Sequence, residues 1–310
     1  MSAVPILLDC DPGHDDAIAL YLALASPELE LLGVTTVSGN QTIEKTTVNA
    51  IRLLDAVGRA DLPVAAGADR PLVRERYGAA YVHGETGLDG PDLPPPSRPP
   101  DARHAVELLA ATLHAAPNPV TVVPTGPLTN LALLLALHPG IGERIERVVL
   151  MGGAIAEGNV TPAAEFNIWA DPEAARRVFE SGLDLTMVGL DVTHQALVGE
   201  PEAERMRGAG RAGAIVADLL GFYGRFHREQ YGWAGSPIHD AVAVAYVARP
   251  GLLETKHRRV DVDCSWELSR GRTLVDLWER TGRPANCHVA TGIDAAGFVE
   301  LLIERISSLP

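Results

Sequence analysis

Acidic side chains gather near the start of the chain, in the stretch Leu8-Asp-Cys-Asp-Pro-Gly-His-Asp-Asp-Ala17. An apolar run precedes this stretch, a Pro-Gly pair enforces a turn within it, and Asp15 and Asp16 then begin a predicted helix. Carboxylates in a first helical turn complement the helix macrodipole, which alone would explain one or two of them. We expect Asp11 to point to the same place from the strand end, and clustered carboxylates repel one another unless a cation or proton offsets them. Oxygen ligands without cysteine or a histidine cluster favour Ca²⁺ or Mg²⁺ over Zn²⁺, so the pattern predicts a metal site.

A histidine and an acidic residue stand side by side far along the chain, in Ser236-Pro-Ile-His-Asp-Ala241. Serine as N-cap and proline at the first helical position predict the start of a helix, which an apolar run then continues. His239 and Asp240 would occupy its first turn. Such a pair alone is more often part of a helix start than of a site, and the acidic turn at 9–16 is what favours a shared site.

The elements that must position these residues follow a βα pattern. Short apolar runs alternate with longer amphipathic ones, which is typical of an α/β fold with an open, mostly parallel central sheet flanked by helices. We expect strands at residues 6–8, 31–37, 120–123, 148–150 and 185–190. We expect helices at 16–24, 46–57, 103–114, 128–137, 172–181, 212–230 and 239–247.

Polar and glycine-rich segments follow each predicted strand, and in open parallel sheets the ligand crevice lies beyond the carboxyl ends of the strands. The proline-rich segment 91–100 predicts a surface loop, because proline disrupts both helices and central strands. Segment 205–213 is interpreted as an irregular connection. Neither a repeat nor a shift in composition divides the sequence, so we expect one domain over 1–310.

Composition limits the classes of partner. The 310 residues carry 26 Lys plus Arg against 40 Asp plus Glu, a formal net charge of −14, which argues against binding nucleic acid or an anionic membrane. Three widely spaced cysteines make neither a disulfide framework nor a CxxC site and favour a reducing compartment. With no signal-peptide pattern at the N-terminus and no apolar run long enough to cross a membrane, we expect a cytoplasmic protein.

The acidic stretch Asp-Cys-Asp-Pro-Gly-His-Asp-Asp-Ala resembles the N-terminal fingerprint of the inosine-uridine preferring nucleoside hydrolases. Further motifs of that family have counterparts here in the same order, so the resemblance covers nearly the whole chain. They are Val-Pro-Thr-Gly-Pro-Leu-Thr-Asn-Leu-Ala at 123–132, Met-Gly-Gly-Ala at 151–154, Ala-Glu-Phe-Asn-Ile at 164–168, Pro-Ile-His-Asp-Ala at 237–241, Gly-Arg-Pro-Ala-Asn at 282–286 and the closing helix at 295–306.

This resemblance implies a single-domain, Rossmann-like fold and the Ca²⁺-dependent hydrolysis of purine or pyrimidine ribonucleosides to free base and ribose. It also implies a homodimer or homotetramer. One Ca²⁺ would be ligated by Asp11, Asp16, Asp240 and the main-chain carbonyl of Thr125. Asp15 would be the general base on a metal-activated water.

The resemblance further implies substrate-binding residues. Those for the sugar and the adjoining pocket would be Asn40, Met151, Asn159, Glu165 and Asn167. Read without the family, Asn40 is equally a turn residue, Met151 a core residue, and Glu165 and Asn167 solvated side chains. Glu165 and Asn167 are two residues apart, so an extended backbone would place them on one face.

Residues around the leaving base are implied in the same way. His239 resembles a histidine that defines one subgroup of the family and would contact or protonate the base, and His83 resembles a histidine on a mobile flap. His227 and Tyr231 share a helical face and resemble base-reading positions in pyrimidine-preferring members, although His227 differs in residue type. Trp169, Trp233, Trp266 and Trp278 are expected mainly to serve packing.

Two other functions remain as alternatives. A Mg²⁺ phosphohydrolase of the haloacid-dehalogenase type also has a DxD after its first strand, but phosphate chemistry needs cationic side chains and this site is anionic. A calcium-dependent nucleoside-binding protein without catalysis would need the same ligands. The presence of Asp15 together with the ligand set favours the hydrolase.

Overall fold

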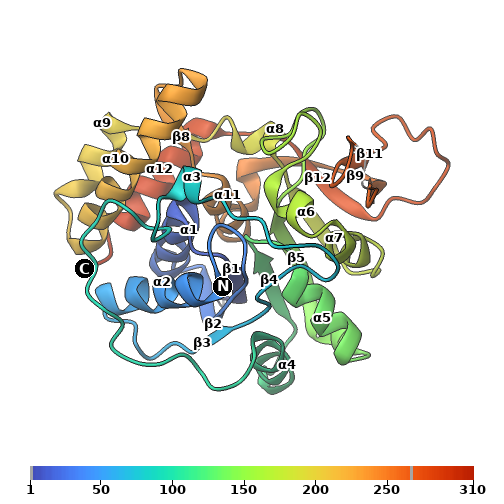
Figure 1. Ribbon diagram of the computed structural model, residues 1–310, viewed down its shortest axis with the longest axis horizontal. Coiled ribbons are helices and arrows are strands. Elements are labelled where there is room, and N and C mark those ends of the chain that lie inside the picture. The colour runs from blue at the N-terminus through green and yellow to red at the C-terminus, as the bar shows by residue number, and fades with distance from the viewer. Residues whose placement is uncertain (1–2, 266–267) are drawn as a thin grey trace.

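One twisted sheet runs through the molecule in the computed structural model, which describes residues 3–265 and 268–310 (Figure 1). Its neighbouring strands are parallel except at one edge, where β12 and β9 are antiparallel. The order is β3 (Val64–Ala66), β2 (Leu29–Thr36), β1 (Val4–Cys10), β4 (Val120–Pro124), β5 (Ile145–Met151), β6 (Leu185–Val188), β12 (Cys287–Ile293) and β9 (Leu253–Arg258). The predicted α/β fold class is therefore confirmed.

Two apolar cores lie on the two faces of this sheet. Successive residues of a strand point to opposite faces, and β1 shows this directly: Ile6 and Leu8 belong to one core and Leu7 to the other. All three side chains are fully buried. A strand buried on both faces is continuously apolar rather than alternating, which is why the short apolar runs predicted these strands.

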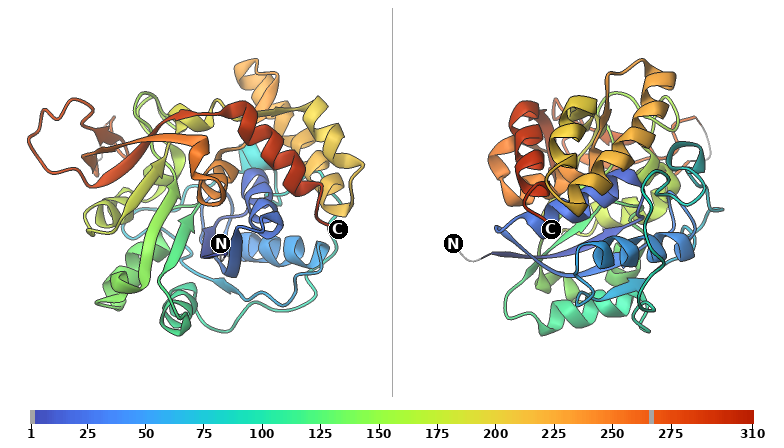
Figure 2. Two further views of the ribbon diagram at one scale, coloured as in Figure 1. Left: turned by 180° about the vertical axis from the view of Figure 1, so that it is seen from behind. Right: turned by 90° about the vertical axis from the view of Figure 1, so that its left-hand side faces the viewer.

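Helices cover both faces (Figure 2). The first core is shared with helices that pack on the sheet or on one another: α1 (His14–Ala25), α2 (Ile43–Ala56), α9 (Glu200–Arg207), α10 (Arg211–Tyr231), α11 (His239–Ala248) and α12 (Ala295–Ile306). The second core is shared with α4 (Ala105–Ala115), α5 (Thr129–Leu137) and α7 (Pro172–Phe179).

Shorter elements connect these layers, and a two-stranded hairpin of β10 (Val260–Val262) and β11 (Thr273–Val275) projects at one side in Figure 1. A second two-stranded pair joins β7 (Leu197–Gly199) to β8 (Gly235–Pro237). The remaining short helices are α3 (Ala80–His83), α6 (Phe166–Ala170), α8 (Leu190–Thr193), η1 (Ile141–Arg144) and η2 (Pro250–Leu252). Within the described part of the chain, no helix combines the length and the apolar character that crossing a bilayer requires.

Each predicted strand and helix is present, with its ends shifted by up to three residues, and segment 91–100 contains neither helix nor strand. The prediction of an irregular connection over 205–213 was right only for 208–210, because residues 205–207 form the last turn of α9 and residues 211–213 begin α10. The start of α9 is stabilised by Glu202, whose carboxylate accepts the Gly199 N–H at 3.0 Å. The strands β3, β9 and β12 were not predicted, since they are short, polar at an edge, or only half-buried.

Candidate active site

The site lies where the strand order reverses, between β1 and β4. From β1 the chain proceeds to β2 on one side of it, and β4 pairs with its other side. The Thr125 N–H donates to the Asp9 carbonyl at 2.8 Å, which joins the segments leaving the two strands. Loops diverging from such a point leave a crevice beyond the carboxyl ends of the strands.

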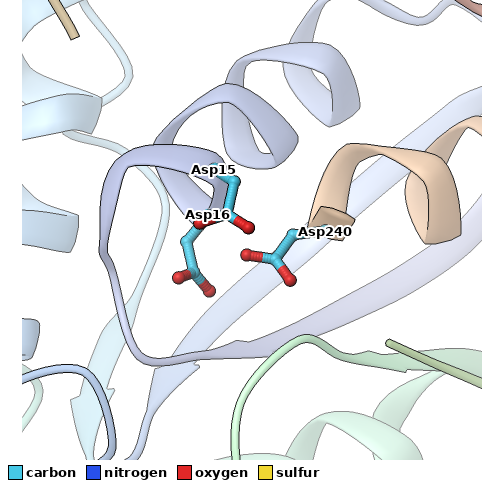
Figure 3. Close-up of side chains that lie close together, drawn as sticks. All are labelled: Asp15, Asp16 and Asp240. Atoms are coloured by element: carbon cyan, nitrogen blue, oxygen red, sulfur yellow. The ribbon is translucent and has the colours of Figure 1, made fainter. Parts of the chain in front are cut away.

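Three carboxylates converge in this crevice. Asp15 and Asp16 lie in the first turn of α1 and Asp240 in the first turn of α11, and all three side chains are buried. Each offers an oxygen that lies within 4.8 Å of those of the other two. Figure 3 shows the three side chains turned toward one another from two helices that are distant in sequence.

Asp16 and Asp11 are held by hydrogen bonds from the surrounding turn. The Asp16 carboxylate accepts the Gly13 N–H at 3.0 Å and the Thr125 hydroxyl at 2.8 Å. Asp11 is fully buried and lies outside the close group of three, but Asn40 links it to that group: its backbone N–H donates to Asp11 Oδ2 at 2.6 Å and its amide to Asp16 Oδ2 at 3.2 Å. A Cβ on Gly126 would lie 2.7 Å from Asp11 Oδ1, so only glycine leaves room for this carboxylate.

The charge and the ligand atoms of this cluster are suited to binding a cation. Burial, with Asp16 as the next cause, raises the pKa of Asp15 to about 8, and burial raises the pKa values of Asp11 and Asp240 well above their usual range. Asp11 Oδ1 is buried without a hydrogen-bond partner among the described residues. Buried carboxylates that repel one another need either protons or a cation, and an all-oxygen set suits a hard divalent ion.

Asp9, the fourth carboxylate of the acidic turn, has a different role. Its Oδ1 accepts the Thr35 hydroxyl at 2.6 Å and the Asn130 amide at 2.8 Å. The same amide donates to the Thr36 carbonyl at 2.9 Å. Asp9 therefore joins β1 to β2 and to α5, beneath the cluster.

A cavity of about 400 Å³ opens above the cluster. Among the described residues, the predicted site residues that line it are Asp15, Asn40, His83, Thr125, Met151, Asn159, Glu165, Asn167, His227, Tyr231, His239 and Asp240. The two predicted residues that do not line it, Asp11 and Asp16, are almost fully buried. Tertiary structure thus brings together side chains from stretches that are far apart in the sequence, 11–16, 40, 83, 125, 151–167 and 227–240.

Comparison with known proteins identifies the family. The family model described as inosine-uridine preferring nucleoside hydrolase matches residues 6–300. The chain belongs to this family. It is therefore an enzyme, a hydrolase of nucleoside N-glycosidic bonds.

Relatives and solved structures agree with that assignment. The hydrolase is 54% identical over 305 residues to a pyrimidine-specific ribonucleoside hydrolase, RihA, of Shewanella sp. (strain ANA-3), covering 98% of this chain and 96% of the relative. It is 51% identical over 306 residues to the protein of the same description from Salmonella typhimurium, covering 98% of each chain. The structure of a purine-preferring ribonucleoside hydrolase from Gardnerella vaginalis superposes with a TM-score of 0.92 at 34% identity, covering 98% of each chain.

One wall of the cavity in the hydrolase is polar, and its side chains are partly engaged with the protein. Glu165 is the N-cap of α6, and its carboxylate accepts N–H groups of Gly153 at 2.9 Å and of Asn167 at 2.9 Å. The Asn167 amide donates to the Thr125 carbonyl at 2.7 Å. The expectation of an extended backbone through Asn167 was wrong, because Asn167 lies in α6, yet both side chains still face the cavity.

The opposite wall is built from histidines and aromatic rings. His239 shares a hydrogen bond of 2.7 Å between its Nδ1 and the Thr193 hydroxyl, which leaves Nε2 as the ring nitrogen available to a ligand. His227 and Tyr231 stack with ring centroids 6.1 Å apart, which confirms that they share a face of α10. Burial lowers the pKa of His239 well below its usual range and that of His227 to about 4, so both rings are neutral at pH 7.

Several cavity residues were missed by the sequence analysis. Trp233 stacks on Tyr231 at 4.7 Å and faces the cavity, so its expected packing role was incomplete. Trp169 does pack, under the Arg270 guanidinium at 3.9 Å, whereas Trp266 lies outside the described residues. Other missed residues are Tyr77, Tyr81, His194, Tyr223 and Phe226. The periodicity of α10 places 223, 227 and 231 on one face, and that signal could have found Tyr223.

The helix start at 236–241 also differs from its prediction. Ser236 and Pro237 belong to β8, and α11 begins at His239 with Ile238 as its N-cap. The tertiary pairing of β8 with β7 holds these two residues in extended backbone. His239 and Asp240 nevertheless occupy the first turn, as predicted.

Proposed function

We propose that this hydrolase cleaves pyrimidine ribonucleosides to free base and ribose, using one Ca²⁺ at the acidic cluster and Asp15 as general base. The observation that carries the proposal is that the acidic cluster and the cavity adjoin each other. A group of buried, mutually repelling carboxylates forms the floor of a cavity whose walls are polar on one side and aromatic on the other. The relatives at 51–54% identity are pyrimidine-specific ribonucleoside hydrolases, which supports the proposed pyrimidine preference.

Asp11, Asp16, Asp240 and the Thr125 carbonyl would hold the ion. Asp11 Oδ1 has no other partner in the described structure, and the Asn167 amide fixes the Thr125 carbonyl. When bound, Ca²⁺ offsets the carboxylate charge and lowers the pKa of water at the site.

Asp15 would take the proton from the attacking water. It lies at the boundary between cluster and cavity, 5% exposed, and unlike Asp16 it also lines the cavity. A general base works best with a pKa near the working pH, and the environment of Asp15 raises its pKa in that direction. Departure of the base leaves an oxocarbenium-like ribose, which nearby carboxylates stabilise electrostatically.

The aromatic and histidine wall would receive the base. His239 Nε2 can exchange a hydrogen bond with a polar atom of the base as the glycosidic bond breaks. His83, His227 and Tyr231 would complete this wall, while Asn40, Met151, Asn159, Glu165 and Asn167 would surround the ribose. Neutral histidines and flat rings match an uncharged heteroaromatic ligand.

The test is ribose release from uridine, cytidine, inosine and adenosine, with chelator and with added Ca²⁺. We expect ribose from uridine and cytidine, loss of activity on chelation and recovery with Ca²⁺. Failure to release ribose from any of the four at micromolar enzyme would overturn the proposed reaction. Faster turnover of inosine or adenosine would overturn the base preference alone.

The phosphohydrolase alternative fits the cavity less well than a nucleoside hydrolase does. A phosphohydrolase needs cationic side chains around the phosphate, and neither lysine nor arginine lines the described cavity. A phosphomonoester assay under the same conditions should therefore give no product. Nucleoside binding without ribose release, measured by calorimetry, would instead favour the non-catalytic alternative.

A further inference from the structure

His14 is a buried histidine to which neither the sequence analysis nor the proposed reaction gives a role. It is the first residue of α1, directly before Asp15, and is 0% exposed. We propose that His14 is a positioning residue that holds the flap, defined as residues 77–89, over the cavity and orients His83 within it. The positioning of the flap by His14 is argued from the contacts described below. Its effect on catalysis rests on the proposed reaction.

Polar contacts join His14 to two points of the flap, His83 at the end of α3 and Asp89 at the end of the flap. Its backbone nitrogen lies 3.2 Å from His83 Nδ1, and its own ring Nδ1 lies 3.1 Å from the same nitrogen. Its Nε2 lies 2.9 Å from the Asp89 carbonyl oxygen. A carbonyl oxygen can only accept, so Nε2 of His14 carries a proton and donates it. In the neutral ring, Nδ1 of His14 then has no proton and can only accept. His83 Nδ1 therefore either donates to this ring nitrogen or accepts the His14 backbone N–H, and in both cases it is engaged with His14.

The ring of His14 is also fixed by stacking. It lies parallel to Phe222 and Tyr223 of α10, with centroids 5.2 and 5.3 Å away and interplanar angles of 5° and 2°. It also stacks on His83 at 5.3 Å. One side chain therefore connects the start of α1, the flap and α10, and its hydrogen-bonding nitrogens have little freedom to move.

The contacts with His14 fix how the ring of His83 is presented to the cavity. Both contacts from His14 engage His83 Nδ1, so Nε2 is the ring nitrogen left for a ligand, and His83 lines the cavity. The approach depends on Gly13, where a Cβ would lie 2.7 Å from His83 Nδ1. His14 thus leaves Nε2 of His83 facing the substrate, and it holds the flap close to the start of α1.

Other contacts tie the flap down without touching His83, and one of them provides a control. The Gln41 amide donates to the Gly84 carbonyl at 2.8 Å. Gln41→Ala removes an anchor of the same flap but leaves both His14 contacts intact. If any loosening of the flap were enough, this variant would behave like a variant of His14.

The variants separate the two nitrogens of His14. His14→Phe keeps a ring between Phe222 and Tyr223 but removes all side-chain hydrogen bonds. His14→Asn puts an amide near the position of Nδ1, and His14→Gln puts one near that of Nε2. Each is combined with His83→Ala in a double-mutant cycle, because residues that act through one another have non-additive effects. The two amide variants also cover the case in which His14→Phe fails to fold.

We expect His14→Phe and His83→Ala each to lower kcat/KM for uridine by about tenfold to a hundredfold, the scale of a displaced active-site group. The double variant should be no slower than His83→Ala within about threefold, and His14→Asn should retain more activity than His14→Gln. A double variant whose loss equals the product of the two single losses would overturn the proposal. That outcome would mean that His14 acts on its neighbour Asp15 or on folding instead.

Hydrogen exchange of the flap provides a readout that needs no turnover. His14→Phe should speed amide exchange over residues 77–89 relative to wild type, while exchange in α12 stays unchanged. Unaltered exchange in the flap would overturn the positioning role even in an active enzyme. If wild-type protein released no ribose, the proposed reaction would fail while this measurement still decided whether His14 holds the flap.

Discussion

At the scale of single residues, Asp15 occupies a different position from its acidic neighbours. Asp16 and Asp11 accept hydrogen bonds from Gly13 and Asn40 and do not line the cavity, whereas Asp15 lies at its floor. Asp15→Asn keeps the size and polarity of the side chain but cannot take a proton. We expect kcat to fall by about 10²- to 10⁴-fold, with Ca²⁺ binding by calorimetry largely retained.

The control for this substitution is Asp184→Asn, a change at a half-exposed carboxylate outside the cavity. It should leave both kcat and Ca²⁺ binding unchanged. An Asp15→Asn enzyme that works at close to the wild-type rate would remove Asp15 from the mechanism. Lost Ca²⁺ binding would instead make Asp15 a ligand.

The raised pKa values of the cluster predict how stability depends on pH. Burial raises the pKa of Asp15 to about 8, against about 3.9 in an unfolded chain. Without a cation, the unfolded state therefore loses its protons first, and this contribution to folding is lost as pH rises from about 4 to about 8. Ca²⁺ competes with protons, so its stabilising effect should grow over the same interval.

Thermal unfolding with chelator and with saturating Ca²⁺ at pH 5, 6.5 and 8 measures this effect. The difference in Tm between the two conditions should increase at each step. In Asp240→Asn, which removes one of the repelling charges, the decline in Tm with chelator should be shallower. A Ca²⁺ effect that is equal at pH 5 and pH 8 would contradict the proposed role of the cluster.

At the scale of elements, two helix starts bring the carboxylates together and one loop covers them. The N-terminus of a helix carries partial positive charge, and both α1 and α11 direct acidic side chains from their first turns into the cluster. A third helix start, that of α7, holds the chain at Leu72, ahead of the flap. There Asp171 accepts the Leu72 N–H at 2.9 Å, the Thr129 hydroxyl at 2.7 Å and the Ala174 N–H at 3.0 Å.

Replacement of Asp171 therefore tests how much the hydrogen bonds at the start of α7 stabilise the fold, and it does not test the proposed reaction. Asp171→Ala leaves one hydroxyl and two N–H groups without their acceptor in a buried place, and we expect it to cost about 2–4 kcal/mol in the free energy of unfolding. Denaturant unfolding measures that value. The matched control is Asp294→Ala at the start of α12, where the side chain accepts the Gly297 N–H at 2.9 Å in an exposed place and the expected cost is about 1 kcal/mol. Equal costs would contradict the assigned role of Asp171.

At the scale of the whole molecule, most of the acidic residues behind the net charge of −14 lie outside the site. Asp11, Asp15, Asp16 and Asp240 account for four carboxylates of 40 acidic residues, so most of the excess lies elsewhere. A nucleoside is uncharged and gains nothing from the long-range field that speeds charged ligands. We therefore expect the electrostatic field of the protein to increase its affinity for Ca²⁺ but to leave the binding of the nucleoside unaffected.

Ionic strength separates these two effects. With Ca²⁺ saturating, kcat/KM for uridine should change by less than about twofold between 0.05 and 0.5 M NaCl, since screening affects only charged ligands. The apparent affinity for Ca²⁺ should weaken over the same range. A steep loss of kcat/KM with salt under Ca²⁺ saturation would instead indicate a cationic substrate, which the anionic protein attracts, and a steep rise would indicate an anionic one.

Assembly and cell location also belong to this scale. We keep a homodimer or homotetramer, a cytoplasmic location and one cooperative domain over 1–310 as predictions. Light scattering gives the mass of the assembly, and a single unfolding transition that coincides by fluorescence and circular dichroism tests the single domain. A monomer by light scattering would contradict the predicted assembly.

The sequence predicted the parts of the fold whose signal is local. Strands β1 and β4 are buried on both faces and were predicted from their apolar runs, whereas the ends of α12 came from the family resemblance. Local patterns also indicated the acidic turn and the His239–Asp240 pair, since polar segments after parallel strands converge, while the other site residues came from the family resemblance. The local patterns did not find β9, whose pairing partner β12 lies about thirty residues further along the chain.

What the sequence determined by itself was the identity of the side chains that could do chemistry and the family that they resemble. Only the tertiary structure decided how these side chains are used. It separated Asp9 from the cluster, placed Trp233 in the cavity and joined His14 to His83 across 69 positions of chain. The physical reason is that a site is defined by distances and burial. These depend on how α1, α10 and α11 pack on one sheet, and no short stretch of sequence contains that information.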